Sequence, residues 1–434
     1  MAQFRIDSHQ YLPQEKTLFE VVMLADQYGN QVGPANPTGM AVDAFGRARV
    51  SMPLTLFDSS QRYQADSRFN LANSATGSSI VYDANASLQS LNITTTANSY
   101  VYRESSRVFA YQPGKSLQIL NTFRMAPAQT GLRQRVGYFG SRDGIYLEQT
   151  DNTVNFVVRS SSSGSLQEER VSQSQWNLDT LDGTGPSKLT LDLTKTHIFW
   201  TDIEWLGVGS VRCGFVINGQ LIHCHSFHHA NLANTTYMTT ACLPVRSEIE
   251  NIGSLASNAT MNVICTSVMS EGGYELRGKN RTAGTAPNSS YTLTTAGVLY
   301  PVVSIRLKSD RPDAIAVPKD IAILGLTGNG TRQAWYLIED AAISGGTWTT
   351  TGTESSVQYN ITATSLSGGN ILDQGYVYVA QQGSGSISKG DDFFRLQLGR
   401  NTFANTNTTF TLAVAGAGAG DTCVGALNWM EITR

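Results

Sequence analysis

The sequence predicts an all-β protein with an extended N-terminal arm, a central antiparallel β-sandwich and a second, C-terminal β domain. Three observations predict it. Short segments with alternating apolar and polar residues recur from about residue 100 onward, as in strands with one buried face. Charged residues make up only 15% of the 434 residues, whereas surface helices are usually rich in Glu, Lys and Arg. Glycine-containing turns separate the segments, as in sandwiches and barrels.

Composition and charge narrow the classes of partner. The net charge is −3 and no basic stripe is visible, so we expect no nucleic-acid partner. The chain has no run of about 18 apolar residues and starts without an apolar signal segment, so we expect neither membrane insertion nor secretion. The five cysteines lack C-x-x-C spacing, which is typical of free thiols in a protein made in a reducing cytoplasm.

Residues 1–60 form the predicted arm. A run rich in Gly, Pro and Asn at 29–39 predicts a loop, and an extended piece at 44–51 places Arg47 and Arg49 on one side. The segment is too short and irregular for a core of its own, so we expect it to anchor the protein by ordering against a neighbouring subunit. A disordered leader is the alternative. The residues expected to make assembly contacts are Phe45, Arg47, Arg49 and Phe57.

Residues 61–277 are predicted to form the central sandwich. Alternation at 116–123 indicates a strand, and residues 141–144 read as a hairpin turn. Asn218-Gly219 between two further strands is the strongest hairpin signal of the chain, because such a turn needs two residues that tolerate positive φ. Several short strands with regular turns favour antiparallel pairing.

Residues 278–434 are predicted to form the second β domain, which we expect to be distal. It begins with a Gly/Ser/Thr/Asn-rich linker or loop at 278–290. An Ala/Gly-rich piece at 413–420 reads as a loop or a tightly packed strand edge, and 426–432 alternates as a closing strand. Further predicted strands lie at 302–307, 322–326, 334–338, 376–380 and 393–398.

Several long runs in the first 250 residues are distinctive. The longest is Trp-Asn-Leu-Asp-Thr-Leu-Asp-Gly-Thr-Gly-Pro at 176–186, and the others lie at 44–59, 111–116, 135–139, 191–196 and 203–209. In these runs the chain resembles a widespread group of tailed-phage virion structural proteins known mostly from environmental, marine and cyanobacterial phages. Together the runs span roughly residues 40 to 250, and the C-terminal third carries none of them.

The resemblance implies a virion component of the tail, a fibre or the adsorption apparatus, made in the cytoplasm of the host bacterium. Its expected partners are further copies of itself in a homo-oligomer and other phage virion proteins. A carbohydrate-binding receptor protein that contacts host cell-surface polysaccharide is the alternative, and a polysaccharide depolymerase is the third hypothesis. The resemblance implies neither a cofactor nor a catalytic site.

Thr-Asp-Ile-Glu-Trp-Leu-Gly at 201–207 is similar to the active-site strand of lichenase- and laminarinase-type glycoside hydrolases, Glu-Ile-Asp-Ile-Glu-Phe-Leu-Gly. That similarity implies a concanavalin-like jelly roll, with Glu204 at the acid/base position and Asp202 at the middle position. Retaining hydrolysis needs a second carboxylate as nucleophile, and that position is Trp200, so we expect no enzyme. Alternate strand residues share a face, which makes Trp200, Asp202 and Glu204 candidate glycan-binding residues.

Four of the six histidines cluster at 223–229. Strand alternation would point His223 and His225 the same way, with His228 approaching from the turn, and imidazole is a zinc ligand. The spacing matches no standard zinc signature, so we expect no metal and interpret the cluster as polar residues of a subunit contact.

Arginines gather near the ends of the predicted strands, and arginine is enriched at protein interfaces. We expect intersubunit ion pairs, with binding of an acidic polysaccharide as the alternative. The residues are Arg133, Arg135, Arg142 and Arg159.

Overall fold

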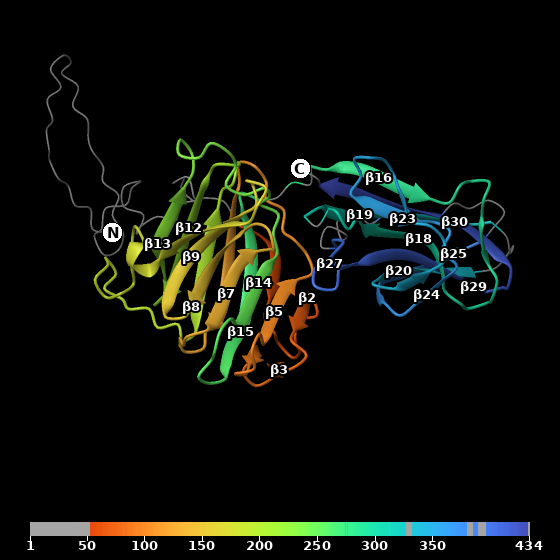
Figure 1. Ribbon diagram of the computed structural model, residues 1–434. Coiled ribbons are helices and arrows are strands. Elements are labelled where there is room, and N and C mark those ends of the chain that lie inside the picture. Colours follow the sequence, from red (N-terminus) through yellow and green to blue (C-terminus); the bar gives the residue numbers. More distant parts are fainter. Residues whose placement is uncertain are drawn as a thin grey trace, which may run out of the picture.

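Two β-sandwiches follow one another along the chain in the computed structural model (Figure 1). The structure describes residues 53–432 apart from 274, 276, 312, 327–331, 380–384 and 389–395. Within these ranges the regular structure consists of strands and one 3₁₀ turn at Gln173–Gln175, so the predicted all-β class is confirmed. No helix in the described part of the chain has the length and apolar character needed to cross a membrane.

The first sandwich contains two antiparallel sheets, which we call sheets 1 and 2. The strands of sheet 1 are, in spatial order, β13 (Gln220–His228), β12 (Ser210–Ile217), β11 (His197–Ile203), β6 (Ser116–Arg124), β15 (Ala259–Glu271), β4 (Leu88–Ile93) and β3 (Ser78–Asp83), with β1 (Leu54–Ser59) also on β15. Those of sheet 2 are β10 (Gln167–Ser172), β9 (Thr153–Ser160), β8 (Gly144–Thr150), β7 (Leu132–Phe139), β14 (Val245–Asn251), β5 (Tyr100–Ser105) and β2 (Phe69–Asn73).

The second sandwich contains sheets 3 and 4. The strands of sheet 3 are β16 (Lys279–Gly284), β30 (Asp421–Ile432), β19 (Ile315–Gly325) and β26 (Gly385–Ser388), with β17 (Tyr291–Leu293) also on β30. Those of sheet 4 are β22 (Thr349–Thr350), β23 (Val357–Asn360), β18 (Tyr300–Leu307), β29 (Thr409–Gly416), β20 (Arg332–Glu339) and β25 (Asn370–Tyr378). Two short pairs complete it, β21 (Ala342–Ser344) with β24 (Ser365–Ser367) and β27 (Arg400–Asn401) with β28 (Thr406–Asn407).

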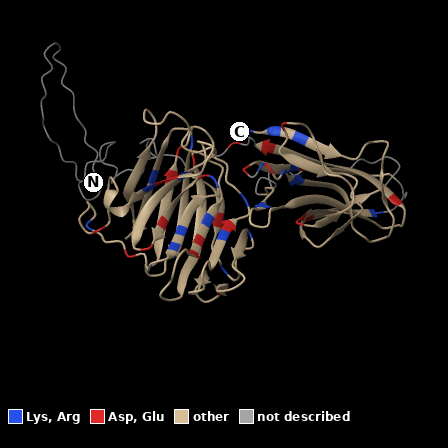
Figure 2. Ribbon diagram, viewed as in Figure 1, with Lys and Arg blue, Asp and Glu red and all other residues tan. Residues whose placement is uncertain are grey.

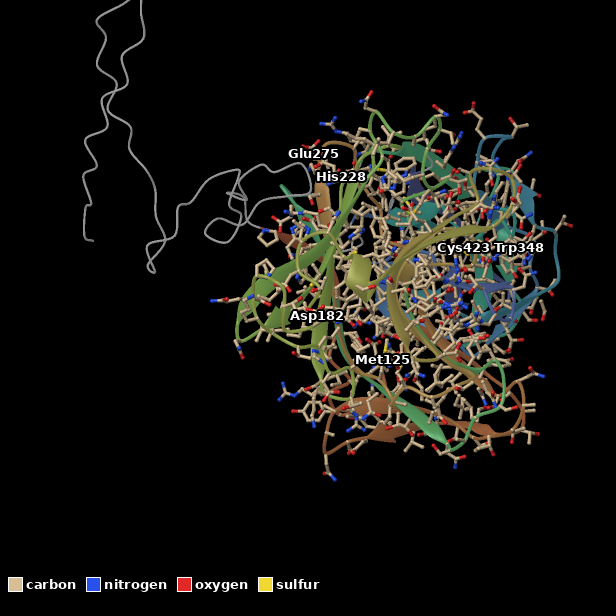
Figure 3. All side chains as sticks on the ribbon, turned by 60° about the vertical axis from the view of Figure 1, so that its left-hand side comes forward. Met125, Asp182, His228, Glu275, Trp348 and Cys423 are labelled. Carbon is tan, nitrogen blue, oxygen red and sulfur yellow. The ribbon has the colours of Figure 1, made fainter. Side chains whose placement is uncertain are left out.

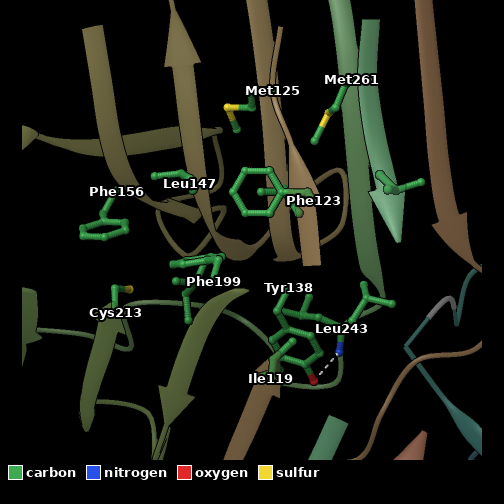
Figure 4. Close-up of a cluster of buried hydrophobic side chains, with 14 of the residues drawn as sticks. Ile119, Phe123, Met125, Tyr138, Leu147, Phe156, Phe199, Cys213, Leu243 and Met261 are labelled. Carbon is green, nitrogen blue, oxygen red and sulfur yellow. Dashed lines mark hydrogen bonds between the residues drawn. The ribbon is translucent and has the colours of Figure 1, made fainter. Parts of the chain in front are cut away.

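Large apolar side chains from sheets 1 and 2 interlock between the sheets (Figure 4). Tyr138 also packs in this core, and its polar hydroxyl is buried together with its ring. That hydroxyl lies 2.7 Å from the carbonyl oxygen of Ala241 and accepts the N–H of Leu243 at 3.0 Å. A buried polar group is costly unless it is hydrogen-bonded, so this phenol ties the 241–243 loop to the core.

The second sandwich ends with its longest strand, β30, on which buried and half-buried residues alternate as the sequence predicted. Trp429 is fully buried, and its indole N–H donates to the buried Glu431 carboxylate at 2.9 Å. The same carboxylate accepts the Ser355 hydroxyl at 2.6 Å and the backbone N–H of Ser356 at 2.9 Å. These bonds compensate the charge for its loss of water.

Three sequence interpretations of this region need correction. The expected loop at 278–290 contains β16, which pairs along its whole length with β30. The Ala/Gly-rich piece at 413–420 begins inside β29, a central strand of sheet 4, because small side chains fit where strands and an overlying hairpin pack closely. A strand was expected at 393–398. Residues 396–398 do not belong to a strand, and residues 393–395 lie outside the described residues.

The predicted arm is only partly described. Phe45, Arg47 and Arg49 lie outside the described residues. Phe57 does not belong to an arm, because it lies on β1 and packs in the first sandwich against Phe69, with ring centroids 5.7 Å apart. Phe57 and Ser59 are buried while Asp58 between them is exposed, as in a strand with one buried face, so the sandwich begins before residue 60.

The two sandwiches contact each other through loops and a small apolar cluster. Ala110 from the first sandwich packs with Ile315 and Val317 from the second. The side chain of Asn70 donates to the carbonyl of Arg400 at 2.8 Å. The backbone N–H of Arg400 in turn donates to the carbonyl of Ser106 at 2.7 Å. Polar and apolar contacts together therefore fix the junction.

Candidate functional site

Strand β11 lies in sheet 1 between β6 and β12 and carries the glycosidase-like sequence. Phe199 and Ile203 point into the core of the sandwich, so alternation places Trp200, Asp202 and Glu204 on the opposite face. That shared face was predicted. All three side chains are nevertheless buried, with exposed fractions of 4%, 0% and 0%. They do not form an open cleft.

Asp202 is held by two partners from the neighbouring strands. The guanidinium of Arg212, directly opposite on β12, pairs with one carboxylate oxygen, and the Ser116 hydroxyl at the start of β6 donates to the other. Charge-assisted bonds of this kind are the stronger class of hydrogen bond. Asp202 is therefore a buried, neutralised carboxylate.

Trp200 occupies the place of the hydrolase nucleophile and fills the space beside it. Its strand partner is Gly214, and a Cβ there would approach the indole ring at 2.8 Å. The ring of His223 lies beside it with centroids 5.5 Å apart. The indole thus lies across the position left open by the glycine, where contact with β12 and β13 fixes it.

Glu204 follows β11 at the start of a tight turn. Its backbone N–H donates to the carbonyl of Ser210 at 3.2 Å. The Tyr111 hydroxyl accepts the N–H of Leu206 at 3.3 Å, and the Tyr111 ring meets Trp205 edge-on at 6.1 Å. Burial, with a smaller contribution from the charge of Glu204, raises the pKa of Tyr111 to about 12. An acid catalyst must reach a solvent-borne substrate, whereas the Glu204 side chain is fully buried.

The histidines do not converge on a common point. The ring of His223 hydrogen-bonds Ser226 at 2.9 Å, and that of His225 accepts the N–H of Asn177 at 3.2 Å. His228, at the margin of the sandwich (Figure 3), hydrogen-bonds Ser210 at 2.9 Å. Burial lowers the pKa of His223 to about 3 and that of His225 to about 4. Among the described residues, no three His, Cys, Asp or Glu side chains are grouped as a metal site.

A β-bulge explains why the expected alignment of His223 and His225 is wrong. The register of β12 and β13 shifts between Cys213 and Gly214, so Cys224 is the extra residue of β13. An extra residue reverses the alternation beyond it. His223 therefore lies over Trp200 on the outer face, while His225 lies against Phe156 in the core.

The sequence predicted that Arg133, Arg135, Arg142 and Arg159 make ion pairs between subunits. In the structure, three of the four pair with glutamates of the same chain. A ladder of alternating charges crosses the outer face of sheet 2 (Figure 2). We call it the charge ladder, and it contains Glu104, Arg133, Arg135, Glu148, Arg159, Glu168, Arg170, Arg246, Glu248 and Glu250. The remaining arginine, Arg142, is exposed.

Arg135 lies at the centre of the charge ladder. It donates to Glu148 on β8 and to Glu248 on β14, each at 2.9 Å, and both carboxylates are buried. Burial would raise the pKa of Glu148, but the guanidiniums of Arg170 and Arg135 outweigh it and lower the pKa. At one side of the sheet, the Tyr146 hydroxyl and Arg159 likewise overcome burial and lower the pKa of Glu168 to about 2.

The charge ladder ends at the second sandwich. Glu104 accepts Arg246 at 2.7 Å and also the hydroxyl of Thr402, which follows β27. The guanidinium of Arg246 lies 5.0 Å from the ring centre of Phe403 in the same hairpin. The sequence shows the arginines and glutamates of each strand, but it does not show which strands pair and therefore which of these charges meet. The ladder therefore stabilises both the sheet and the domain junction.

A cavity of about 170 Å³ lies at that junction. Residues of both sandwiches line it, among them Glu104, Arg142, Asp313 and Arg400. Of these, Glu104 is paired with Arg246, and the backbone N–H of Arg400 bonds the carbonyl of Ser106.

No known protein family matches this chain, and no curated protein matches it. Solved structures match about half of it. A Bacillus licheniformis β-glucanase is 12% identical over 49% of this chain and 96% of its own, with a TM-score of 0.32. A Bacteroides ovatus GH16 protein of a mixed-linkage glucan locus is 11% identical over 49% and 99%, with a TM-score of 0.34. The CBM2 module of the evolved Dit of Lactobacillus casei BL23 phage J-1 is 8% identical over 52% and 99%, with a TM-score of 0.33.

Proposed function

We propose that this chain is a non-enzymatic structural component of a tailed-phage virion, made in the host bacterial cytoplasm and assembled by protein–protein contacts into a homo-oligomer and onto other virion proteins. The observation that carries it is the closed outer face of β11. Asp202 is paired with the Arg212 guanidinium and accepts a hydrogen bond from the Ser116 hydroxyl, and Trp200 stands at the sequence position of the hydrolase nucleophile.

A retaining glycosidase needs two accessible carboxylates about 5 to 5.5 Å apart, one as nucleophile and one as acid/base. A tryptophan ring cannot form a glycosyl ester. Asp202 is paired with Arg212, and Glu204 is fully buried. The strand therefore keeps a sequence similar to that of the hydrolases while its side chains serve packing.

The structural role is supported by the resemblance over roughly residues 40 to 250 and by the bracing of the two sandwiches. The charge ladder and the apolar contacts of Ala110 join them. A virion component must transmit load between neighbours without separating, and several small contacts that act together suit that task.

Catalysis is tested with wild type and Glu204→Gln on β-glucans and bacterial surface polysaccharides, with release of reducing ends as the readout. We expect no turnover by either protein. General acid catalysis contributes about 10² to 10⁴ in rate, so turnover by wild type that disappears in the variant would make this chain an enzyme and overturn the proposal.

Assembly is tested on the full chain by light scattering coupled to size exclusion. We expect a discrete closed oligomer, because structural homo-oligomers usually have point-group symmetry. The variant F45A/R47A/R49A should lose it while keeping its β-type circular dichroism, and Arg124→Ala, at an exposed arginine outside the proposed contacts, serves as the matched control. A wild type that stays monomeric at every concentration would contradict the homo-oligomer.

A further inference from the structure

Two tyrosines on the edge of sheet 4 are among the most exposed large side chains of the described residues. Tyr376 and Tyr378 on β25 are 74% and 62% exposed. The residue between them, Val377, is buried in the second core, so both rings stand on the opposite, solvent face of the strand. Large rings placed for packing would be covered, whereas these two are presented to solvent side by side.

The neighbouring strand extends this surface. Tyr336 on β20 lies opposite Gln374 of β25, and Ala334 lies opposite Tyr376. Ala334 in turn pairs with Ala415 of β29. Two rings two residues apart on a strand are separated by about 6.6 Å, and the small alanines leave the flank of the Tyr376 ring open. We call Tyr336, Gln374, Tyr376 and Tyr378 the tyrosine face.

The backbone beneath the tyrosine face is fixed. Gly375 lies opposite Trp335, and a Cβ at this glycine would approach the indole nitrogen at 2.6 Å. The buried indole therefore packs directly against the backbone of β25, which pairs in continuous register with β20 from Arg332 to Leu337. Binding to such a preformed surface does not require ordering a loop, which lowers its entropic cost.

The chemistry of the tyrosine face indicates its ligand. A phenol ring offers a flat apolar face and a hydroxyl at its rim, and the Gln374 amide offers both a donor and an acceptor. A pyranose ring is complementary to that set, because its C–H groups form a flat apolar face and its hydroxyls lie around the rim. The one charged residue in register with the face is Arg332, opposite Tyr378, so a neutral or weakly acidic sugar fits best.

We propose that the tyrosine face binds hexose units of a cell-surface polysaccharide by stacking on Tyr376 and Tyr378. This site lies in the second sandwich and is separate from β11, so it goes beyond the structural role proposed above. A strand added from a partner protein would pair with the open backbone edge of β25 and would leave the faces of the two rings uncovered. The position of the rings on the sheet face therefore favours sugar.

The test uses the full chain on an array of neutral glucans, mannans, galactans and bacterial surface polysaccharides. We expect wild type to be retained by at least one class. The double variant Y376A/Y378A should lose at least about tenfold in affinity, because aromatic anchors supply most of the binding energy at small sites. Tyr376→Phe keeps the stacking ring and should bind nearly as wild type does. Leu221→Ala, an exposed apolar position on the first sandwich at 52%, is the control.

Two outcomes would overturn the proposal. The first is that no glycan is retained by wild type, or that Y376A/Y378A retains it equally well. The second is that Y376A/Y378A changes the oligomer seen by light scattering while glycan binding is unaffected, because the face would then be a protein contact. Melting temperature and circular dichroism of each variant show that it is folded. Loss of glycan binding with an intact oligomer separates this proposal from the structural one.

Discussion

Replacing Arg135 at the centre of the charge ladder should be one of the most destabilising single changes in the first sandwich. We consider Arg135→Met, which keeps most of the side-chain length and removes the guanidinium. Glu148 and Glu248 then each lose a bond of 2.9 Å. Both carboxylates are almost fully buried, so water cannot fully replace the lost donor.

The magnitude follows from the partners that remain. A hydrogen bond to a charged group contributes about 1.5 to 3 kcal/mol, and breaking a buried ion pair costs about 3 to 5 kcal/mol. Glu148 keeps Arg170 at 2.8 Å, and Glu248 keeps Arg246 at 2.6 Å. Since each carboxylate retains one partner, we expect the lower end, a loss of about 3 kcal/mol in the free energy of unfolding.

The assay is equilibrium unfolding of the full chain in urea, followed by tryptophan fluorescence and circular dichroism. The matched control is Arg142→Met, because Arg142 is an exposed arginine in the turn between β7 and β8 of the same sheet. This variant should change the free energy of unfolding by less than about 0.5 kcal/mol. A double variant Arg135→Met/Glu248→Gln should recover part of the loss, since it removes one unmatched charge. If Arg135→Met unfolds within about 0.5 kcal/mol of wild type, the charge ladder does not stabilise the sheet.

Two further predictions concern the same sandwich. Gly214→Ala should destabilise the chain by about 1 to 3 kcal/mol because its methyl group would meet the backbone oxygen of Ile222 and the Trp200 indole, whereas Gly352→Ala, which meets nothing within 4 Å, should be near neutral; equal melting of the two variants would contradict the close packing around Gly214. Stability should begin to fall as pH drops below about 6.5, because the folded-state pKa values of His223 and His225 are lowered to about 3 and about 4 and the unfolded chain takes up those protons first. It should fall more steeply from pH 4.5 toward 2, because the folded-state pKa of Glu168 is lowered to about 2 and that of Glu248 is also lowered; a pH titration of urea midpoints checks this, and a midpoint that does not change between pH 5 and 2 would contradict it.

The central strands and their turns were predictable because their signals are local. Alternation at 116–123 became β6, and Asn218-Gly219 forms the expected turn with φ of 53° and 76°. The Ala/Gly-rich strand β29 gave no such signal, since small residues satisfy both a loop and a tightly packed strand. Its place at the centre of sheet 4 comes from pairing with β18 and β20.

In the candidate site, some features depend on neighbouring residues in the sequence and others depend on how distant strands pair. Sequence alone put Trp200, Asp202 and Glu204 on one face, because a strand repeats every two residues. It could not give their burial or the Arg212 partner of Asp202, which come from strand order. Nor could it give the bulge at Cys224 that sends His223 and His225 to opposite faces. The tyrosine face likewise appears only when β25 pairs with β20.

The sequence by itself determined the all-β class, the alternation of strands with a clear local signal such as β6, and the presence of Trp200 at the sequence position of the hydrolase nucleophile, because each depends on residues adjacent in the chain. Only the tertiary structure decided that Arg135 pairs with Glu248, more than a hundred residues away, and that Tyr376 lies opposite Ala334, next to the pair of Tyr336 and Gln374. The physical reason is register: a strand fixes which side chains share its face, but a partner strand from a distant part of the chain decides what they touch and whether water reaches them.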